Sequence, residues 1–228
     1  MTTNNDWLSV PAPDQWMTGW DKYHKKLLEV PEEQLKFMGF IAHPVQVVGS
    51  HMRGNYQNMN ILELGCGDGR YACFLAKLGC NVYAIDALKS AVEITKKRAK
   101  VMGVEDRIKV ELKDMDGWDI PKNKYDVIIA VQVLQYLFDR AIPRLKEIAG
   151  AVKSGGYVVY CGNIPPHFDT DPPIRFIYKN ELEELFEGWT FLSFGQDKRL
   201  IRADDLRGYI WTVVRKPNGK EEKQEKRE

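Results

Sequence analysis

One stretch decides the fold of this chain: Ile61-Leu62-Glu63-Leu64-Gly65-Cys66-Gly67-Asp68-Gly69. An apolar segment carries a carboxylate near its end, and three glycines then follow at every second position. Glycine accepts positive φ angles and leaves room for a ligand against the backbone. Residues 70–78 continue with a helical pattern, and a strand that runs through such a turn into a helix is how α/β sheets hold nucleotides. We therefore expect a nucleotide-like ligand at this turn.

The spacing of the glycines narrows the identity of that ligand. The order here is G-x-G-x-G, whereas dinucleotide-binding turns carry G-x-G-x-x-G. The carboxylate of Glu63 suits a ligand with a positive ammonium group, which S-adenosylmethionine has. The pattern therefore favours S-adenosylmethionine, and an NAD-type oxidoreductase remains as the less favoured alternative.

Size and charge limit the remaining possibilities. The chain has 228 residues, of which 44% are apolar, so it is long enough for one domain with an appendage. Its formal net charge is +1, which gives no reason to expect a polyanionic partner. Nucleic acid is therefore disfavoured, although the basic residues of segment 96–100 would supply phosphate contacts if they formed a free face rather than the solvated side of a helix.

The expected compartment is the cytoplasm. Met1 is followed by polar residues instead of a signal peptide, and no apolar run reaches the roughly 20 residues of a membrane span. Cysteines in such a protein are expected to be reduced and buried, and their spacing here is not that of metal ligands, so we expect no metal site. The cysteines are Cys66, Cys73, Cys80 and Cys161.

The organisation along the chain has three expected parts: a helical cap or lid over residues 1–58, a ligand-binding domain over 59–215 and a charged disordered tail over 216–228. The cap is expected to hold a helix over 14–29 with Asp14 as its N-cap, a second over 31–42 and a short third that begins at Pro44. The domain is expected to alternate strands at 60–64, 81–86, 107–112, 125–130 and 155–161 with helices at 70–78, 88–102 and 139–152, and to end in helix 179–186 and an antiparallel pair of strands, 189–196 and 208–215.

Two further carboxylates follow candidate strands. Asp86 lies 21 residues after Gly65, where a carboxylate accepts hydrogen bonds from a ribose diol; the alternative is an N-cap for the next helix. Asp114 ends the third strand and is expected to accept from the adenine amino group, with the Met115 backbone at the ring nitrogen. The exit of the fourth strand, with Val131, is expected to lie beside the sulfonium, where apolar or neutral residues suit a charge that disappears during methyl transfer.

Together these residues resemble class I S-adenosylmethionine-dependent methyltransferases over about residues 59–215. The resemblance implies an α/β, Rossmann-like fold with a seven-stranded, mostly parallel sheet, an antiparallel last strand and helices on both faces. It also implies S-adenosyl-L-methionine as cofactor and S-adenosyl-L-homocysteine as product. The cofactor-binding residues that it implies are Glu63, Gly65, Cys66, Gly67, Gly69, Arg70, Asp86, Ala87, Asp114, Met115 and Val131.

Within that class the chain is most similar to the TehB-like (tellurite-resistance) and thiopurine-type small-molecule methyltransferases. The similarity rests on segments 66–70, 133–137, 154–157 and 184–189. Tellurite-type enzymes carry a His-Arg pair in the penultimate loop, which here reads Ile201-Arg202 and so lacks the histidine. The resemblance implies catalytic roles for Arg202 and His43, although a surface ion pair and a structural histidine are equally good explanations. The candidate substrate contacts are Trp20, Tyr23, Tyr136 and Arg175, of which the aromatic ones also suit core packing.

The expected reaction is an in-line displacement in which a small-molecule acceptor attacks the methyl group. A thiol or metalloid oxyanion needs little base assistance, and this sequence shows no unambiguous general base, so a soft or anionic acceptor is favoured. Methylation of protein or RNA and ligand binding without turnover remain alternatives. The sequence determines neither the acceptor nor the oligomeric state.

Overall fold

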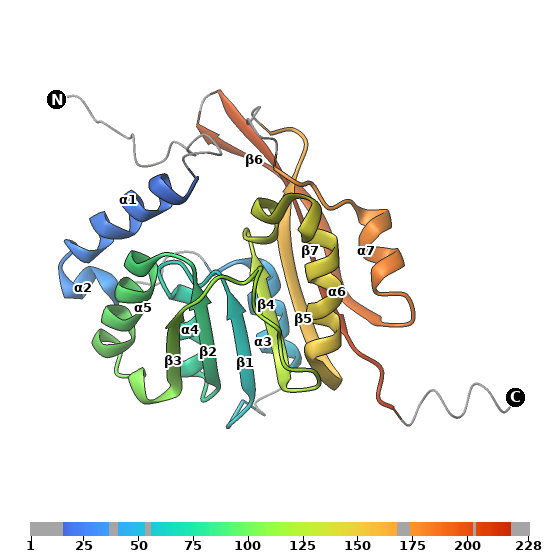
Figure 1. Cartoon of the computed structure of the whole chain (residues 1–228), viewed down its shortest axis with the longest axis horizontal. Coiled ribbons are helices and arrows are strands. Elements are labelled where there is room, and N and C mark those ends of the chain that lie inside the picture. Colours follow the sequence, from blue (N-terminus) through green and yellow to red (C-terminus); the bar gives the residue numbers. More distant parts are fainter. Residues whose placement is uncertain (1–15, 37–40, 53–55, 168–173, 203, 220–228) are drawn as a thin grey trace, which may run out of the picture.

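We describe the protein from a computed structural model, for residues 16–36, 41–52, 56–167, 174–202 and 204–219. Its centre is a seven-stranded sheet in the order β3-β2-β1-β4-β5-β7-β6, with helices on both faces (Figure 1). The strands are β1 (Asn60–Leu64), β2 (Asn81–Asp86), β3 (Ile108–Leu112), β4 (Tyr125–Val131), β5 (Val152–Ile164), β6 (Thr190–Arg202) and β7 (Asp205–Arg215).

The strand directions confirm the predicted fold class. Neighbours among β1 to β5 pair in parallel, whereas β7 lies antiparallel between β5 and β6. Parallel neighbours need a crossover on one face of the sheet, which explains why helices separate most of the first five strands in the sequence. The carboxyl ends of these strands therefore meet at one edge, where a ligand site is expected.

Alternation along the strands divides the core into two layers. Ile61, Val127 and Ile129 belong to the layer that packs on α3 (His43–His51), α4 (Arg70–Lys77) and α5 (Lys89–Val101). Leu62 and Ile128 face the other way, toward α6 (Ala141–Ala151) and α7 (Lys179–Leu185). Successive side chains of a strand point to opposite faces, so both faces of the central strands are apolar and buried. Two 3-10 helices complete the domain, η3 (Glu105–Arg107) and η4 (Leu134–Arg140).

The N-terminal helices differ in one respect from the prediction. Helix α1 (Trp16–Leu28) packs on α5. A helix begins after Pro31 as predicted, but α2 covers only Glu32–Leu35, so the predicted extension of this helix to residue 42 is wrong. Ala42 is extended because it is the N-cap of α3, with a proline in that helix's first turn, and an extended N-cap cannot continue a preceding helix. Residues 37–40 and the predicted N-cap Asp14 lie outside the described residues.

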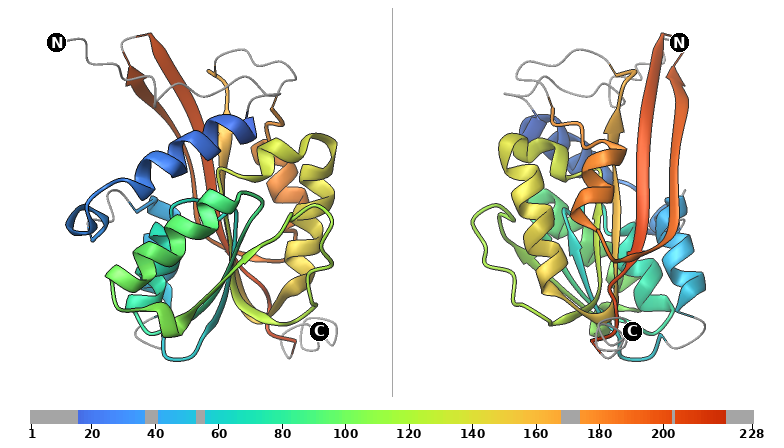
Figure 2. Two further views of the ribbon diagram at one scale, coloured as in Figure 1. Left: turned by 60° about the vertical axis from the view of Figure 1, so that its left-hand side comes forward. Right: turned by 90° about the vertical axis from the view of Figure 1, so that its right-hand side faces the viewer.

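The last two strands are longer than predicted. The pairing of β5 with β7 stops at Ile164 and Gly208, but β6 and β7 continue to pair with each other up to Arg202 and Asp205. The hairpin therefore projects past the carboxyl ends of the parallel strands, on the side where α1 lies (Figure 2). Both faces of this ribbon are partly exposed, so it lacks the apolar alternation from which a strand is recognised.

Candidate functional site

The glycine turn between β1 and α4 is shaped by backbone that only glycine adopts readily. Gly65, Gly67 and Gly69 have φ angles of 65°, 54° and 74°. A Cβ on Gly65 would lie 2.4 Å from a methyl carbon of Val133, so a side chain there would clash. A Cβ on Gly67 would instead have its nearest neighbour 3.5 Å away, the Nε2 atom of His24. The middle of the turn is therefore the part that faces the cap helix.

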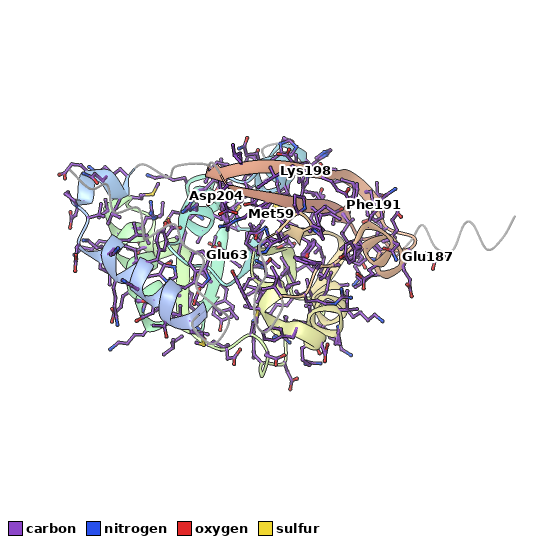
Figure 3. The ribbon with its side chains drawn as sticks, turned by 90° about the horizontal axis from the view of Figure 1, so that it is seen from above. Met59, Glu63, Glu187, Phe191, Lys198 and Asp204 are labelled. Atoms are coloured by element: carbon purple, nitrogen blue, oxygen red, sulfur yellow. The ribbon has the colours of Figure 1, made fainter. Side chains whose placement is uncertain are left out.

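Glu63 lies in β1 immediately before this turn. Its side chain is 2% exposed, and its Oε2 atom is buried without a hydrogen-bond partner among the described residues. Burial raises the pKa of this carboxyl well above its usual value, and Asp68 raises it further. Figure 3 looks down on the carboxyl ends of the strands and shows Glu63 near the middle of that edge. A buried carboxyl with an unused oxygen suits a cationic ligand group.

Asp68 holds the turn through two arginines. The Nε and Nη2 atoms of Arg70 each donate to its carboxylate at 2.9 Å, and Arg98 on α5 donates to its backbone oxygen at 2.7 Å and to its carboxylate at 3.2 Å. Burial would raise the pKa of Asp68, but the hydrogen bond and the charge of Arg70 hold it below its usual value. The Arg70 side chain, a predicted cofactor contact, therefore braces the turn from within.

Asp86 ends β2 and reaches across to the same turn. One carboxylate oxygen accepts the Gly67 amide and the other accepts the Leu88 amide, both at 2.9 Å. The side chain therefore closes a turn at the start of the next helical segment and fastens the glycine turn as well. A carboxylate has about four acceptor positions, so two remain for a ribose diol. Ala87, beside it, is exposed.

The residues after β3 form the next wall of the site. Met115 is buried, and its methyl carbon lies 3.7 Å from the Cβ position on Gly65, whereas Asp114 is exposed and accepts the Asp116 amide at 2.9 Å. The buried Arg144 of α6 donates to the Met115 and Trp118 carbonyls, the second at 2.8 Å. Sequence reasoning missed Arg144, because an arginine on a helix is normally solvated.

Four aromatic side chains of the cap and of η4 come together above the turn. The Trp20 indole donates to the Tyr136 hydroxyl at 3.3 Å, and its ring stacks on His24 with centroids 6.2 Å apart. Tyr23 contacts His24 edge-on at 5.5 Å. His24 is 4% exposed, and its Nδ1 has no partner among the described residues. Its spacing of four residues from Trp20 was the available sequence signal, because residues four apart share a helix face.

Amide side chains surround the ends of β4 and β5, beyond Val131. The Gln135 amide donates to Gln132 at 3.1 Å and to Asn163 at 2.9 Å, and Gln132 donates to the sulfur of Cys161 at 3.5 Å. Gln132 has a φ angle of 57°, which is uncommon for a non-glycine residue and marks an unusual turn. These groups are neutral, as we expected beside a sulfonium, but the sequence did not single out the amides.

The predicted catalytic residues His43 and Arg202, and the predicted substrate contact Arg175, lie in other surroundings. His43 is exposed at the start of α3 and meets Trp211 of β7 edge-on, with centroids 5.9 Å apart. The Arg175 guanidinium pairs with Glu181, while its backbone amide donates to the Gln135 carbonyl at 3.0 Å. The backbone of Arg202 pairs with Asp205 near the hairpin tip, and its side chain lies outside the described residues. None of these contacts joins His43 or Arg175 to the glycine turn.

A family of known proteins matches this chain over the region that carries the glycine turn. Residues 61–156, from β1 to the start of β5, match the family "Methyltransferase domain". A TehB protein of Haemophilus influenzae is 26% identical over 152 residues, which are 65% of this chain and 52% of that protein. A ubiquinone biosynthesis O-methyltransferase of Rickettsia akari is 32% identical over 98 residues, 42% of this chain and 38% of that protein. The chain thus spans about half or less of the length of these relatives.

Solved structures share the fold. The crystal structure of Haemophilus influenzae TehB has a TM-score of 0.61 and 21% identity, over 86% of this chain and 67% of that one. The [4+2]-cyclase SpnF has a TM-score of 0.64 and 17% identity, over 92% and 98%. The matched domain, the strand order and the glycine turn define the class: the chain carries a class I S-adenosylmethionine-dependent methyltransferase domain.

Membrane-spanning helices and clusters of metal ligands are both absent from the part of the chain that the structure describes. None of its helices is long and apolar enough to cross a membrane. No three His, Cys, Asp or Glu side chains in those ranges gather so that they would hold a metal ion.

Proposed function

We propose that this protein transfers the methyl group of S-adenosylmethionine to a small-molecule acceptor and releases S-adenosylhomocysteine. The observation that carries the proposal is the buried Glu63 carboxyl, whose Oε2 lacks a partner beside a turn of three left-handed glycines. Burying an ionisable group with an unpaired oxygen costs stability. The presence of the Glu63 carboxyl is therefore best explained by a ligand that forms a hydrogen bond with this oxygen. The relatives that match the chain include methyltransferases by name.

The residues present fit the cofactor. Glu63 would meet its ammonium group, Asp86 its ribose diol, and the Met115 segment its adenine. When bound, the cofactor supplies an electrophilic methyl group that an acceptor displaces. The chain's own contribution is to hold both partners in line and to keep the surroundings of the methyl group neutral, through Gln132 and Gln135.

The acceptor we propose is soft or already anionic. The side chains around the ends of β4 and β5 are amides, a thiol and the Tyr136 phenol, and burial raises the pKa values of Cys161, to about 11, and of Tyr136. Neither group is ionised near neutral pH, so neither acts as a ready base. A thiolate or an oxyanion brings its own nucleophilic electron pair and needs no such group.

Methylation of RNA has less support. Within the basic segment 96–100, Lys97 donates to the Leu28 carbonyl at 2.7 Å and Arg98 is buried against Asp68. Two of the four basic side chains are thus committed to the cap and the turn, and an exposed basic face would need all of them. Four buried, unbridged cysteines also fit a reducing compartment, and we propose the cytoplasm.

Calorimetry with S-adenosylhomocysteine tests the proposal. We expect the wild type to bind it and Asp86→Ala to weaken binding more than tenfold, about 1.4 kcal/mol, because paired hydrogen bonds to the ribose are lost. Asp106→Ala, an exposed carboxylate in η3, is the matched control and should bind normally.

Turnover is tested with an acceptor panel. Release of S-adenosylhomocysteine that depends on a thiol or metalloid oxyanion supports the proposed reaction. Tight NADH binding without S-adenosylmethionine binding would refute it, and so would folded Asp86→Ala with unchanged affinity. Binding without turnover over the whole panel would leave the protein a binder, contrary to the proposal.

A further inference from the structure

Two buried polar groups flank the glycine turn, and each has an unused atom. Glu63 lies in the strand that leads into the turn, with Oε2 unpartnered, and His24 lies in the cap helix above the turn, with Nδ1 unpartnered. They are 2% and 4% exposed. Asp68, Asp86 and Arg70 act on the pKa values of both, so the two groups share one electrostatic neighbourhood. Two buried side chains with unpaired polar atoms beside one turn point to a ligand that forms hydrogen bonds with both.

The chemistry of the two groups is complementary to a zwitterion. A carboxyl accepts from an ammonium group, and an imidazole donates to a carboxylate. The other cations near the turn are already committed: Arg70 forms a bidentate pair with Asp68, and Arg98 bonds to Asp68 and to the Leu35 carbonyl. An α-amino-acid group bound at the turn would bring an ammonium group to Glu63 and a carboxylate to the imidazole of His24.

We propose that His24 binds the carboxylate of the amino-acid end of the cofactor, opposite Glu63, and takes up a proton when it does so. This inference rests on the proposed function. It makes His24 a cofactor-contacting residue, placed by α1, whereas the sequence pointed to no partner for that carboxylate. The aromatic neighbours Trp20 and Tyr23 hold the imidazole over the turn.

The surroundings of His24 explain the proton. Burial lowers its pKa, so the free protein holds a neutral imidazole near pH 7, although Asp86 and Asp68 from the sheet edge and Asp21 from α1 act in the opposite direction. Arg70 of α4 adds to the lowering. A ligand carboxylate adds a fourth negative charge and raises the pKa of the bound imidazole. At pH values between its free and bound pKa, His24 therefore takes up a proton on binding, and its contribution to affinity weakens as pH rises past the bound one.

The test pairs a change in the protein with a change in the ligand. The ligands are S-adenosylhomocysteine and its decarboxylated analogue, 5′-(3-aminopropylthio)-5′-deoxyadenosine, which keeps the ammonium group and loses the carboxylate. The proteins are the wild type, His24→Asn and the control His51→Asn, a histidine at the end of α3. Calorimetry at pH 7 in buffers of different ionisation enthalpy gives affinity and proton uptake together.

We expect the wild type and His51→Asn to prefer S-adenosylhomocysteine by about tenfold or more, the value of one charge-assisted hydrogen bond. His24→Asn should lose most of that preference and should take up fewer protons on binding than the wild type, while its affinity for the decarboxylated analogue stays within about threefold of wild type. Thermal unfolding checks that the variant is folded, and His24→Gln serves as the second variant if it is not.

An unchanged ligand preference in folded His24→Asn or His24→Gln would overturn the inference, and so would equal numbers of protons taken up by wild type and variant on binding S-adenosylhomocysteine. Equal weakening of both ligands would assign His24 a packing role only, which also refutes it. If the wild type binds neither adenosyl compound, the proposed function itself fails, so the two failures are distinguishable.

Discussion

At Glu63 the chain keeps a carboxyl where burial alone favours an apolar side chain. The neighbouring strand positions Leu62 and Leu64 are apolar and buried, and the Glu63 pKa is raised by the same burial. A folded-state pKa above the unfolded value means that, at pH values between the two, the folded protein holds a proton that the unfolded chain has released. The stability from this group is therefore present below about pH 4.5 and is lost as pH rises through the folded-state pKa.

Glu63→Gln should consequently stabilise the free protein at neutral pH and weaken its cofactor binding. The amide has the shape of the protonated carboxyl and does not titrate, so we expect a gain of about 1 kcal/mol or more at pH 8, roughly 2–4 °C in melting temperature, that shrinks toward pH 5. S-adenosylhomocysteine affinity should fall about tenfold or more, because the ammonium group loses its counter-charge.

Thermal unfolding at pH 5 and pH 8, with calorimetry, measures both effects. Glu184→Gln on the exposed side of α7 is the control and should change neither. A Glu63→Gln protein that is less stable at pH 8, or that binds as well as wild type, would contradict this account of Glu63.

At the scale of elements, helix α6 holds the segment after β3 in place. This is the segment that we predicted from the sequence to contact adenine. Arg144 is 1% exposed and its guanidinium reaches the Met115 and Trp118 carbonyls and the Glu147 carboxylate. The segment between β3 and β4 has no regular structure of its own over 113–124, so these bonds from a helix position it. The element thus acts on the site through a loop, not by direct contact.

Arg144→Met should therefore affect both stability and affinity. It keeps much of the apolar stem but leaves the Met115 and Trp118 carbonyls without this donor, at about 1–3 kcal/mol each, and it loosens the loop that we propose contacts adenine. We expect a drop of at least 2 kcal/mol in urea unfolding and severalfold weaker S-adenosylhomocysteine binding. Lys146→Met, exposed on the same helix, should be neutral, and equal effects of the two substitutions would argue against the role of Arg144.

At the scale of the whole molecule, the cap and the α/β sheet come together at the site. Helix α1 packs on α5, Lys97 and Arg98 bond to the Leu28 and Leu35 carbonyls, and His24 covers the glycine turn. A ligand held between these parts binds the folded protein and not the unfolded chain. Its binding energy therefore adds to the stability of the whole fold.

We expect S-adenosylhomocysteine at 100 times its dissociation constant to stabilise the protein by about 2.7 kcal/mol, which for a chain of this size is roughly 5–10 °C in melting temperature. Differential scanning calorimetry at several ligand concentrations measures the shift. A rise with NADH and none with S-adenosylhomocysteine would be incompatible with the assigned class of site.

The strands and helices around the glycine turn were predictable because the residue pattern of each segment agrees with its place in the fold. The bounds of β1 and β2 match the prediction residue for residue, and α4 and α5 differ by about one residue at their ends. Strands buried on both faces give continuous apolar runs, and the glycine turn leaves a distinct mark. The hairpin tip and α2 were not predictable in length, since an exposed ribbon and a single helical turn lack a periodic pattern.

By itself, the sequence determined the order of the strands and helices, the cofactor class and the position of Glu63 and Asp86 at strand ends. These follow from backbone preferences and burial, which act over a few residues. Only the tertiary structure decided that Arg70 pairs with Asp68, that Arg144 holds the loop after β3, and that His24 faces the turn. Each of these depends on which distant segments pack together, and a side chain's partners across the fold leave no mark in its own neighbourhood of the sequence.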